Sequence, residues 1–422
     1  MLTIDAERLW NSLMELARIG ATPKGGVRRL ALSDEDRRGR DCFRDWCRAA
    51  GMQVEVDAIG NIFARRAGTD RDLAPVAIGS HLDSQPSGGK FDGAYGVMAG
   101  LEVVRTLDDA GVRTRAPLEV VAWTNEEGSR FVPTCMGSGV FAGVHSLEHV
   151  LQQRDVDGVS VRDALGRIGY DGTASPHRLD AYFEAHIEQG PVLEEQGKTI
   201  GVVVGALGQR WFDVVVVGQD AHAGPTPMQT RRDALLAASR LVGEVHRIGS
   251  RSPDYARGTV GFMVVQPNSR NVVPGEVRMS VDLRSAKWAT LDAMVDDLRR
   301  CIRSVQDECR VEIALEEVVA FQPSEFAAEL VAHVRDAAQS LGHSHLDIVS
   351  GAAHDAVYMS RIAPTAMVFV PCAGGISHNE LESARPEHLA AGCDVLLHAV
   401  LRRAGASGGR AAASEARERG EA

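Results

Sequence analysis

The sequence lacks the charge pattern and the apolar runs that nucleic-acid-binding and membrane proteins need. It has 46 lysines and arginines against 57 aspartates and glutamates, and no basic run forms a positive stripe. Binding to a phosphate backbone depends on clustered positive charge, so nucleic acid is excluded as a partner. No apolar run is long enough to cross a bilayer. Residues 1–8 lack the basic start and the apolar core of a secretory signal.

Disulfide frameworks, zinc-binding cysteine pairs and dinucleotide-binding glycine motifs are also missing. The seven cysteines are scattered singly without a Cys-x-x-Cys pair, which is typical of reduced thiols in a cytoplasmic protein. Cys42 and Cys47, five positions apart in a predicted helix, do not have zinc-ligand spacing. No Gly-x-Gly-x-x-Gly follows the first predicted strands, which argues against a Rossmann oxidoreductase. These absences predict a cytoplasmic protein without nucleic-acid or membrane partners.

The chain has the length and the patterning of a two-domain α/β protein. Its 422 residues exceed one ordinary core, so two domains are expected. Short apolar strands alternate with helical stretches in the first half and again near the C-terminus, at residues 76–79, 118–124, 181–185 and 365–370. This alternation favours a mixed, mostly parallel sheet flanked by helices. We assign residues 1–207 and 321–404 to this discontinuous domain.

The segment between them, residues 208–320, has a different pattern. Its elements follow the order strand, helix, strand, strand, helix, strand, at residues 212–218, 232–248, 258–265, 276–283, 290–305 and 311–316. This order is typical of a compact α+β unit of ferredoxin-like type, and roughly 110 residues suit an inserted domain. Residues 405–422 are rich in glycine, alanine, serine, arginine and glutamate, and we expect them to be disordered.

A glycine-rich loop after the strand at 76–79 contains a candidate metal site. The loop places His81, Asp83 and Asp92 within residues 79–93. A histidine ligand usually donates its second ring N–H to a carboxylate, and Asp83 is two positions away to accept it. Asp92 could bridge a pair of ions. The alternative is a polar loop that only turns the chain, but the ligand types favour a metal.

Three other predicted strands also end in potential ligands. The second strand precedes Glu126 and Glu127, the third precedes His186 and Glu188, and the fourth precedes His378. Open α/β sheets bind ligands beyond the carboxyl ends of their strands. One histidine near a strand end is more often a hydrogen-bonded surface residue, and paired glutamates usually face solvent. Four such endings at one edge of one sheet favour metal binding over these alternatives.

The combined ligand set indicates a hydrolase with two metal ions. Three histidines and two carboxylates, one of them shared, can hold two divalent ions roughly 3.5–4 Å apart. Mixed nitrogen and oxygen ligands suit zinc, manganese, cobalt or nickel better than calcium or magnesium. One glutamate of the Glu126–Glu127 pair would remain free beside the metals, where a carboxylate can act as a general base.

Six motifs give the chain its resemblance to a known family. They are HLDSQPSGGKFDG, TNEEGSRF, HIEQGP, HAGPTPM, PNSRNVVPG and GISHNE. Over about residues 5–403 the chain resembles the metal-dependent hydantoinase/carbamoylase amidases of the M20 metallopeptidase clan. This family includes N-carbamoyl-L-amino-acid hydrolases, β-ureidopropionases and allantoate amidohydrolases. The resemblance implies a dimetal catalytic domain and an inserted lid domain that also forms a homodimer.

The resemblance also implies a role for each candidate ligand. Asp92 matches the bridging carboxylate, and Glu126 matches the catalytic base. The other implied ligands are His81 and His186 on one ion, and Glu127 and His378 on the other. We interpret Asp83, His354 and Asp355 as residues that support the ligands or the fold.

Four more residues are implied to contact the substrate. His222 would stabilise the developing oxyanion at the partner subunit's site, and Gln189 would contact the carbamoyl group. Asn271 would bind substrate, and Arg284 would clamp its carboxylate, a task suited to the bidentate guanidinium. The plainer alternatives are a turn histidine for His222, a turn cap for Asn271 and a surface ion pair for Arg284.

The implied reaction is hydrolysis of the linear ureido C–N bond of an N-carbamoyl amino acid, which releases the amino acid, carbon dioxide and ammonia. The alternatives are β-ureidopropionase or allantoate amidohydrolase activity, an M20-type aminoacylase or peptidase, and a catalytically silent binding protein. Ala353 stands where relatives commonly carry glycine, so the sequence leaves the size of the substrate side chain open.

Overall fold

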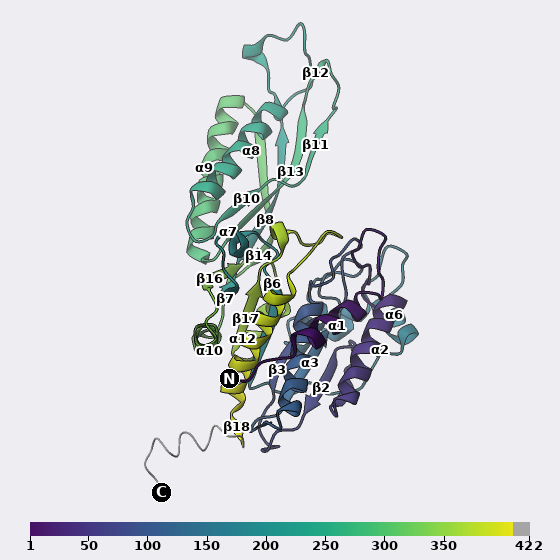
Figure 1. The fold of residues 1–422 in the computed structure, drawn as a ribbon. Coiled ribbons are helices and arrows are strands. Elements are labelled where there is room, and N and C mark those ends of the chain that lie inside the picture. The colour runs from purple at the N-terminus through teal and green to yellow at the C-terminus, as the bar shows by residue number, and fades with distance from the viewer. Residues whose placement is uncertain (408–422) are drawn as a thin grey trace. The chain divides into compact units, whose positions relative to one another are not determined.

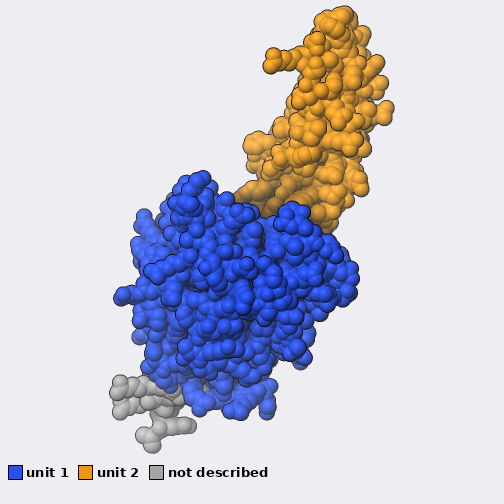
Figure 2. Space-filling model, turned by 90° about the vertical axis from the view of Figure 1, so that its right-hand side faces the viewer, with its two compact units in different colours: residues 1–204, 326–422 blue, residues 205–325 orange. Residues whose placement is uncertain are grey.

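The computed structural model describes residues 1–407 and divides into two compact units (Figure 1, Figure 2). One unit comprises residues 1–204 and the chain from residue 326 onward, and the other comprises residues 205–325. Near the end of the described chain, β18 (Ala406–Ser407) pairs with β4 (Arg113–Thr114). The rest of the predicted tail, residues 408–422, lies outside the described residues.

A mixed sheet forms the centre of the first unit. Its strands lie in the order β1, β2, β5, β3, β6, β17, β7, and β16 also pairs with β7. Their bounds are β1 Gln53–Val56, β2 Ile62–Arg66, β3 Val76–His81, β5 Leu118–Trp123, β6 Ala181–Ile187, β7 Ile200–Ala206, β16 His345–Ser350 and β17 Thr365–Val370. The four central strands β5, β3, β6 and β17 run parallel to one another. Every residue of these four strands is buried, as expected of parallel strands covered on both faces.

Helices of the first unit pack on this sheet in groups. Helices α1, α3 and α12 contact one another, and α10 contacts α12. Helices α3 and α12 pack on β3 and β6, whereas α2 packs on β1 and β2. Helices α4 and α11 contact each other, and they contact β5 and β6 respectively. The bounds are α1 Ala6–Leu16, α2 Asp34–Ala49, α3 Ala94–Asp109, α4 Met136–Phe141, α5 Leu147–Leu151, α6 Val161–Ile168, α7 Val192–Glu195, α10 Ala328–Ser340, α11 Asp355–Met359 and α12 Pro386–Ala404. Helices α1 and α2 begin where Asp5 and Ser33 accept backbone N–H bonds, as N-cap residues do.

The second unit is an antiparallel sheet with two long helices. Its strands lie in the order β10, β13, β8, β14, and β11 also pairs with β13. The bounds are β8 Gly208–Val217, β10 Arg257–Thr259, β11 Met263–Gln266, β13 Glu276–Ser285, β14 Glu312–Phe321, α8 Ala234–Arg251 and α9 Trp288–Cys309. A separate ribbon joins β9 (Ala221–His222) to β12 (Val272–Val273), and β15 (Ser324–Glu325) pairs with the end of β7.

The core of the second unit follows the alternation of its strands. Phe212, Val214 and Val216 of β8 point to one face and are buried with the apolar sides of α8 and α9. The strand predicted at 258–265 is instead two short strands, β10 and β11, because the regular pairing with β13 is interrupted at residues 260–262. The other predicted elements of this segment are present in the predicted order. Among the described residues, no helix is long and apolar enough to span a membrane.

Candidate metal centre and active site

The predicted ligands follow the carboxyl ends of four adjacent parallel strands. In the sheet register, His81 at the end of β3 pairs with Trp123 at the end of β5. His186 near the end of β6 pairs with Phe369 near the end of β17. The strands therefore end at one edge, and the loops that follow them carry the remaining candidates. This is the arrangement expected from the sequence.

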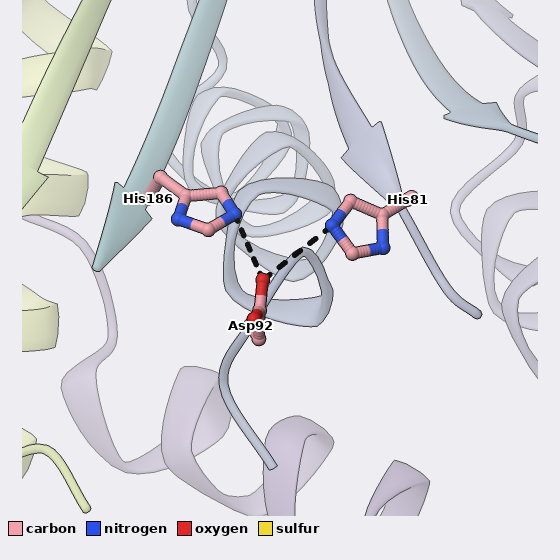
Figure 3. A group of neighbouring side chains, drawn as sticks. All are labelled: His81, Asp92 and His186. Carbon is pink, nitrogen blue, oxygen red and sulfur yellow. Dashed lines mark ion pairs between the residues drawn. The ribbon is translucent and has the colours of Figure 1, made fainter. Parts of the chain in front are cut away.

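Asp92 lies between the two buried histidines (Figure 3). Its Oδ1 atom is 3.5 Å from Nε2 of His81 and 3.2 Å from Nε2 of His186. The aspartate comes from the loop before α3, whereas the histidines come from β3 and β6. All three side chains are almost fully buried. They form one group whose nitrogen and oxygen atoms could hold a metal ion.

The second oxygen of Asp92 belongs to another group. Its Oδ2 atom is 3.4 Å from Nε2 of His378, and Oε2 of Glu127 is 3.3 Å from the same nitrogen. Asp92, Glu127 and His378 therefore form a second possible metal site. Asp92 gives one oxygen to each group, so it is the residue that joins them.

The ring contacts of the two buried histidines fit metal ligation. Nδ1 of His81 is 3.0 Å from the carbonyl oxygen of Asp83, and Nδ1 of His186 is 2.9 Å from that of Ile187. A neutral ring that donates Nδ1–H to a carbonyl turns the lone pair of Nε2 toward the ligand groups. In both rings Nε2 then faces an Asp92 oxygen, and Nε2 of His186 also accepts the Gly93 N–H at 3.1 Å. A cation bound between these atoms would relieve the repulsion between each ring lone pair and the carboxylate.

The role predicted for Asp83 needs one correction. Its carboxylate was expected to accept the ring N–H of His81, but Oδ1 is 3.9 Å from Nδ1 and the backbone carbonyl is the closer acceptor. The carboxylate instead accepts the backbone N–H groups of Glu126 and Glu127, at 3.2 and 3.3 Å. Asp83 thus ties the loop after β3 to the loop after β5.

Glu126 lies beside the first group without belonging to either. Its Oε2 is 3.5 Å from Nε2 of His81, and the thiol of Cys135 donates to its Oε1 at 3.4 Å. Burial, together with Asp355 and Glu127, raises the pKa of Glu126 well above its ordinary value. Burial and Asp92 raise the pKa of Glu127 to about 8. So many buried carboxylates repel one another, and bound cations would relieve that repulsion.

Of the two candidate residues that follow β6, one lies at the site and the other does not. Gln189 lies at the site, because its Nε2 donates to Oδ2 of Asp92 at 2.9 Å. Glu188 does not join the ligand groups. Its carboxylate accepts the backbone N–H groups of Val192 and Leu193 at the start of α7, both at 2.8 Å. Gln189 lies beyond the end of β6 and has a positive φ of 59°, so the chain bends there and the two neighbouring side chains point to different places.

Sequence reasoning missed several residues that contact the site. Glu382 is buried and accepts backbone N–H groups beside Asp92, and Ser377 donates to Oδ2 of Asp92. Cys135 contacts Glu126. Glu382 and Ser377 flank His378 in the sequence, and a search for polar residues around each ligand would have found them. Cys135 carries no comparable signal.

His354 and Asp355 lie close behind the ligands. The His354 ring packs edge-on against His186, and its Nε2 is 2.9 Å from the Ser350 hydroxyl. Burial and the neighbouring His186 lower the pKa of His354 well below its ordinary value, so the ring is neutral. Asp355 accepts a hydrogen bond of 2.5 Å from Ser138. Both contacts suit residues that support the site.

Comparisons with known proteins agree with this geometry. The sequence matches peptidase family M20/M25/M40 over residues 77–402. It is 48% identical over 400 residues to an N-carbamoyl-L-amino-acid amidohydrolase of Rhizobium meliloti, covering 94% of this chain and 96% of that protein. A hydantoinase/carbamoylase family amidase from Burkholderia multivorans is 55% identical and superposes with a TM-score of 0.93, covering 96% of this chain and 98% of that chain. The chain belongs to this amidase family.

Other relatives show how wide the amidase's family is. An N-carbamoyl-L-amino acid amidohydrolase of Geobacillus stearothermophilus is 39% identical and covers 94% of this chain and 98% of that protein. An allantoate amidohydrolase of Bacillus subtilis is 35% identical, and the match covers 90% of this chain and 93% of that protein. Metal dependence is typical of the family, and the amidase has the matching candidate ligand groups. The predicted family, α/β fold class and amidohydrolase class are confirmed.

The other predicted substrate residues of the amidase lie in its second unit. His222 on β9 pairs with Val272, and the carbonyl of the preceding Asn271 accepts the N–H of Ala223. The ribbon therefore brings His222 and Asn271 close together, and both are exposed. Arg284 lies on β13, where its guanidinium donates to the Asp282 carboxylate at 2.9 Å. Their roles toward a substrate stay predictions.

Proposed function

We propose that this amidase hydrolyses the ureido C–N bond of N-carbamoyl-L-amino acids, releasing the amino acid, carbon dioxide and ammonia. The observation that carries the proposal is Asp92, which is shared by two ligand groups with Glu126 beside them. The relatives from Rhizobium meliloti and Geobacillus stearothermophilus, both named for this activity, support the choice of substrate. The donors suit two divalent ions such as zinc, manganese, cobalt or nickel.

Each ligand group would hold one ion. His81, Asp92 and His186 would bind the first, and Asp92, Glu127 and His378 would bind the second. When bound, such a pair of ions polarises the carbonyl group and makes water easier to deprotonate. The protein must then supply proton transfer, substrate positioning and charge stabilisation.

Glu126 is the proton carrier in this proposal. Its Oε2 lies beside the ligand groups, where a carboxylate can take a proton from water and return it to a leaving group. Glu126 would take a proton from the attacking water and return it to the leaving nitrogen. The tetrahedral adduct then collapses to the amino acid and carbamate, which breaks down to carbon dioxide and ammonia.

The substrate contacts are assigned from residue type and family resemblance. Arg284 would pair with the substrate carboxylate through its planar guanidinium, and Asn271 would add a hydrogen bond. Gln189 would contact the carbamoyl group, and its position against Asp92 supports that role. His222 would donate to the developing oxyanion, which needs a preorganised donor. We propose that residues 208–320 act as a lid and as the interface of a homodimer.

An ammonia-release screen tests the substrate. Metal-free enzyme would be reloaded with one metal at a time and offered an N-carbamoyl-L-amino acid, N-carbamoyl-β-alanine, allantoate and an N-acetyl-L-amino acid. The proposal expects fastest ammonia release from the first compound and none from the last. Preference for allantoate, which the Bacillus subtilis relative makes the second candidate, would replace the proposed substrate while keeping the chemistry. Cleavage of the N-acetyl compound alone would indicate an aminoacylase; this reaction releases acetate rather than ammonia, so it is followed by formation of the free amino acid.

A further inference from the structure

A buried carboxylate outside both ligand groups holds the loop of Asp92 in place. Glu382 is only 2% exposed. Its Oε1 accepts the backbone N–H groups of Phe91 and Asp92, at 2.9 and 3.2 Å. Its Oε2 accepts from the Ser377 hydroxyl at 3.0 Å. Glu382 therefore spans from the bridging aspartate to the residue directly before His378.

The loop that precedes Asp92 packs closely against the Glu382 carboxylate. A Cβ atom added at Gly89 would overlap the carboxyl group of Glu382. The glycine therefore lets the backbone before Asp92 close over the glutamate. A side chain at position 89 would displace Glu382 without changing its chemistry, which gives an independent way to test its role.

The two ligand groups depend on this contact to different degrees. His81 and His186 are buried on strands of the sheet, and their rings are fixed by backbone carbonyls. His378 lies in a loop, has a positive φ of 52° and is half exposed. Glu382 is four residues beyond it and joins its loop to the segment that carries Asp92. The second group therefore needs an anchor that the first already has in the sheet.

We propose that Glu382 is a positioning residue that sets the affinity of the group Asp92, Glu127 and His378 for its ion. The proposal rests on the two-ion centre described above. Glu382 acts through the backbone of Asp92 and through the Ser377 hydroxyl, which can donate to either Glu382 or Asp92 but not to both at once. Replacing a residue that hydrogen-bonds to a metal ligand commonly lowers metal affinity about 10–100-fold.

The experiment titrates metal-free enzyme with Mn²⁺ by calorimetry and measures bound metal by mass spectrometry after gel filtration. Glu382→Ala should weaken binding of one of the two ions about 10–100-fold and leave the other near its wild-type affinity. Glu382→Gln keeps an oxygen for the two backbone N–H groups and should bind both ions within a few-fold of wild type. Gly89→Ala should resemble Glu382→Ala, since it pushes the intact carboxylate aside.

Glu380→Ala is the matched control. Glu380 lies in the same loop but pairs with Lys24 at 3.7 Å, away from Asp92, so both ions should bind as in wild type. Wild-type binding of both ions by Glu382→Ala would overturn the proposal, as would equal weakening in Glu382→Gln, because that variant keeps the acceptor.

Folding and metal stoichiometry separate the remaining outcomes. Thermal unfolding of each metal-free variant shows whether the fold is intact, and a purely structural role would lose both ions together with the fold. Should Glu382→Ala fail to fold, Gly89→Ala decides, and unchanged affinity in that variant overturns the proposal. A wild-type enzyme that binds fewer than two ions would instead refute the two-ion centre, a result seen before any variant is compared.

Discussion

Replacing Asp92 by asparagine should turn the proposed two-ion centre into a one-ion centre. The carboxylate places Oδ1 beside the rings of His81 and His186, and Oδ2 beside the ring of His378, which also faces Glu127. Asparagine has nearly the same shape but keeps one oxygen, and its amide nitrogen has no lone pair for a metal. One group therefore keeps three protein ligands, whereas the other falls to two.

The expected loss of affinity follows from the number of ligands. Structural zinc sites with four protein ligands bind with about 10–16 kcal/mol, so each ligand contributes roughly 2.5–4 kcal/mol on average. That corresponds to a loss of affinity of roughly 10²–10³-fold for the ion that loses its oxygen. Asp92→Ala removes both oxygens, and it should lower the affinity for both ions by this factor.

Equilibrium dialysis followed by metal analysis gives the stoichiometry directly. At a free metal concentration ten times the wild-type dissociation constant, wild type should hold two ions, Asp92→Asn one and Asp92→Ala almost none. Asp57→Asn is a control, because Asp57 accepts hydrogen bonds from Asn61 in a loop outside both ligand groups. Two ions retained at normal affinity in Asp92→Asn would refute the shared-carboxylate assignment.

Three further predictions follow from the same geometry. Glu126→Gln should keep both ions but lower kcat about 10²–10⁴-fold, the usual contribution of a general base; kcat within tenfold of wild type would contradict its role. The metal-free enzyme should lose stability as the pH rises from about 5 to 8, because burial and Asp92 raise the pKa of Glu127 to about 8, far above the value of about 4.3 of an unfolded chain. The folded state then binds more protons than the unfolded state in that range, so this contribution to stability is fully present below the unfolded pKa and is lost toward pH 8. Urea unfolding of chelator-treated enzyme should show the free energy of unfolding falling with pH, and Glu127→Gln should flatten this dependence. A free energy of unfolding that rises with pH would refute the prediction. Arg284→Ala should raise KM for N-carbamoyl amino acids about 100-fold, as expected when a charge-assisted pair worth about 3 kcal/mol is lost; an unchanged KM would place the carboxylate clamp elsewhere.

The sequence was most informative where chemistry and position coincide. His81, Glu127, His186 and His378 each follow or end an apolar strand, and parallel strands that lie side by side must end at the same edge. Ligand type, strand order and motif spacing were therefore enough to predict the metal groups. The same local patterns predicted the α/β unit and the inserted α+β segment.

The sequence was less informative where a side chain could turn in more than one direction. Glu188, like His186, was a potential ligand near the end of β6, yet its carboxylate accepts the first backbone N–H groups of α7. Asp83 had the right spacing to accept from His81, yet its carboxylate binds the loop after β5. In both cases nearby backbone N–H groups needed an acceptor, and only the folded chain shows where those groups lie.

By itself the sequence determined the family and the amidohydrolase class, because six motifs carry the resemblance, and it predicted the metal ligands and the general base. It also predicted that the ligands gather at one edge, since strands that alternate with helices favour a parallel sheet whose strands end at the same edge. Only the tertiary structure decided that Asp92 gives one oxygen to each group, and that Glu382, 290 positions away, holds its backbone. Contacts of that separation depend on how loops close over the sheet, and no local pattern encodes them.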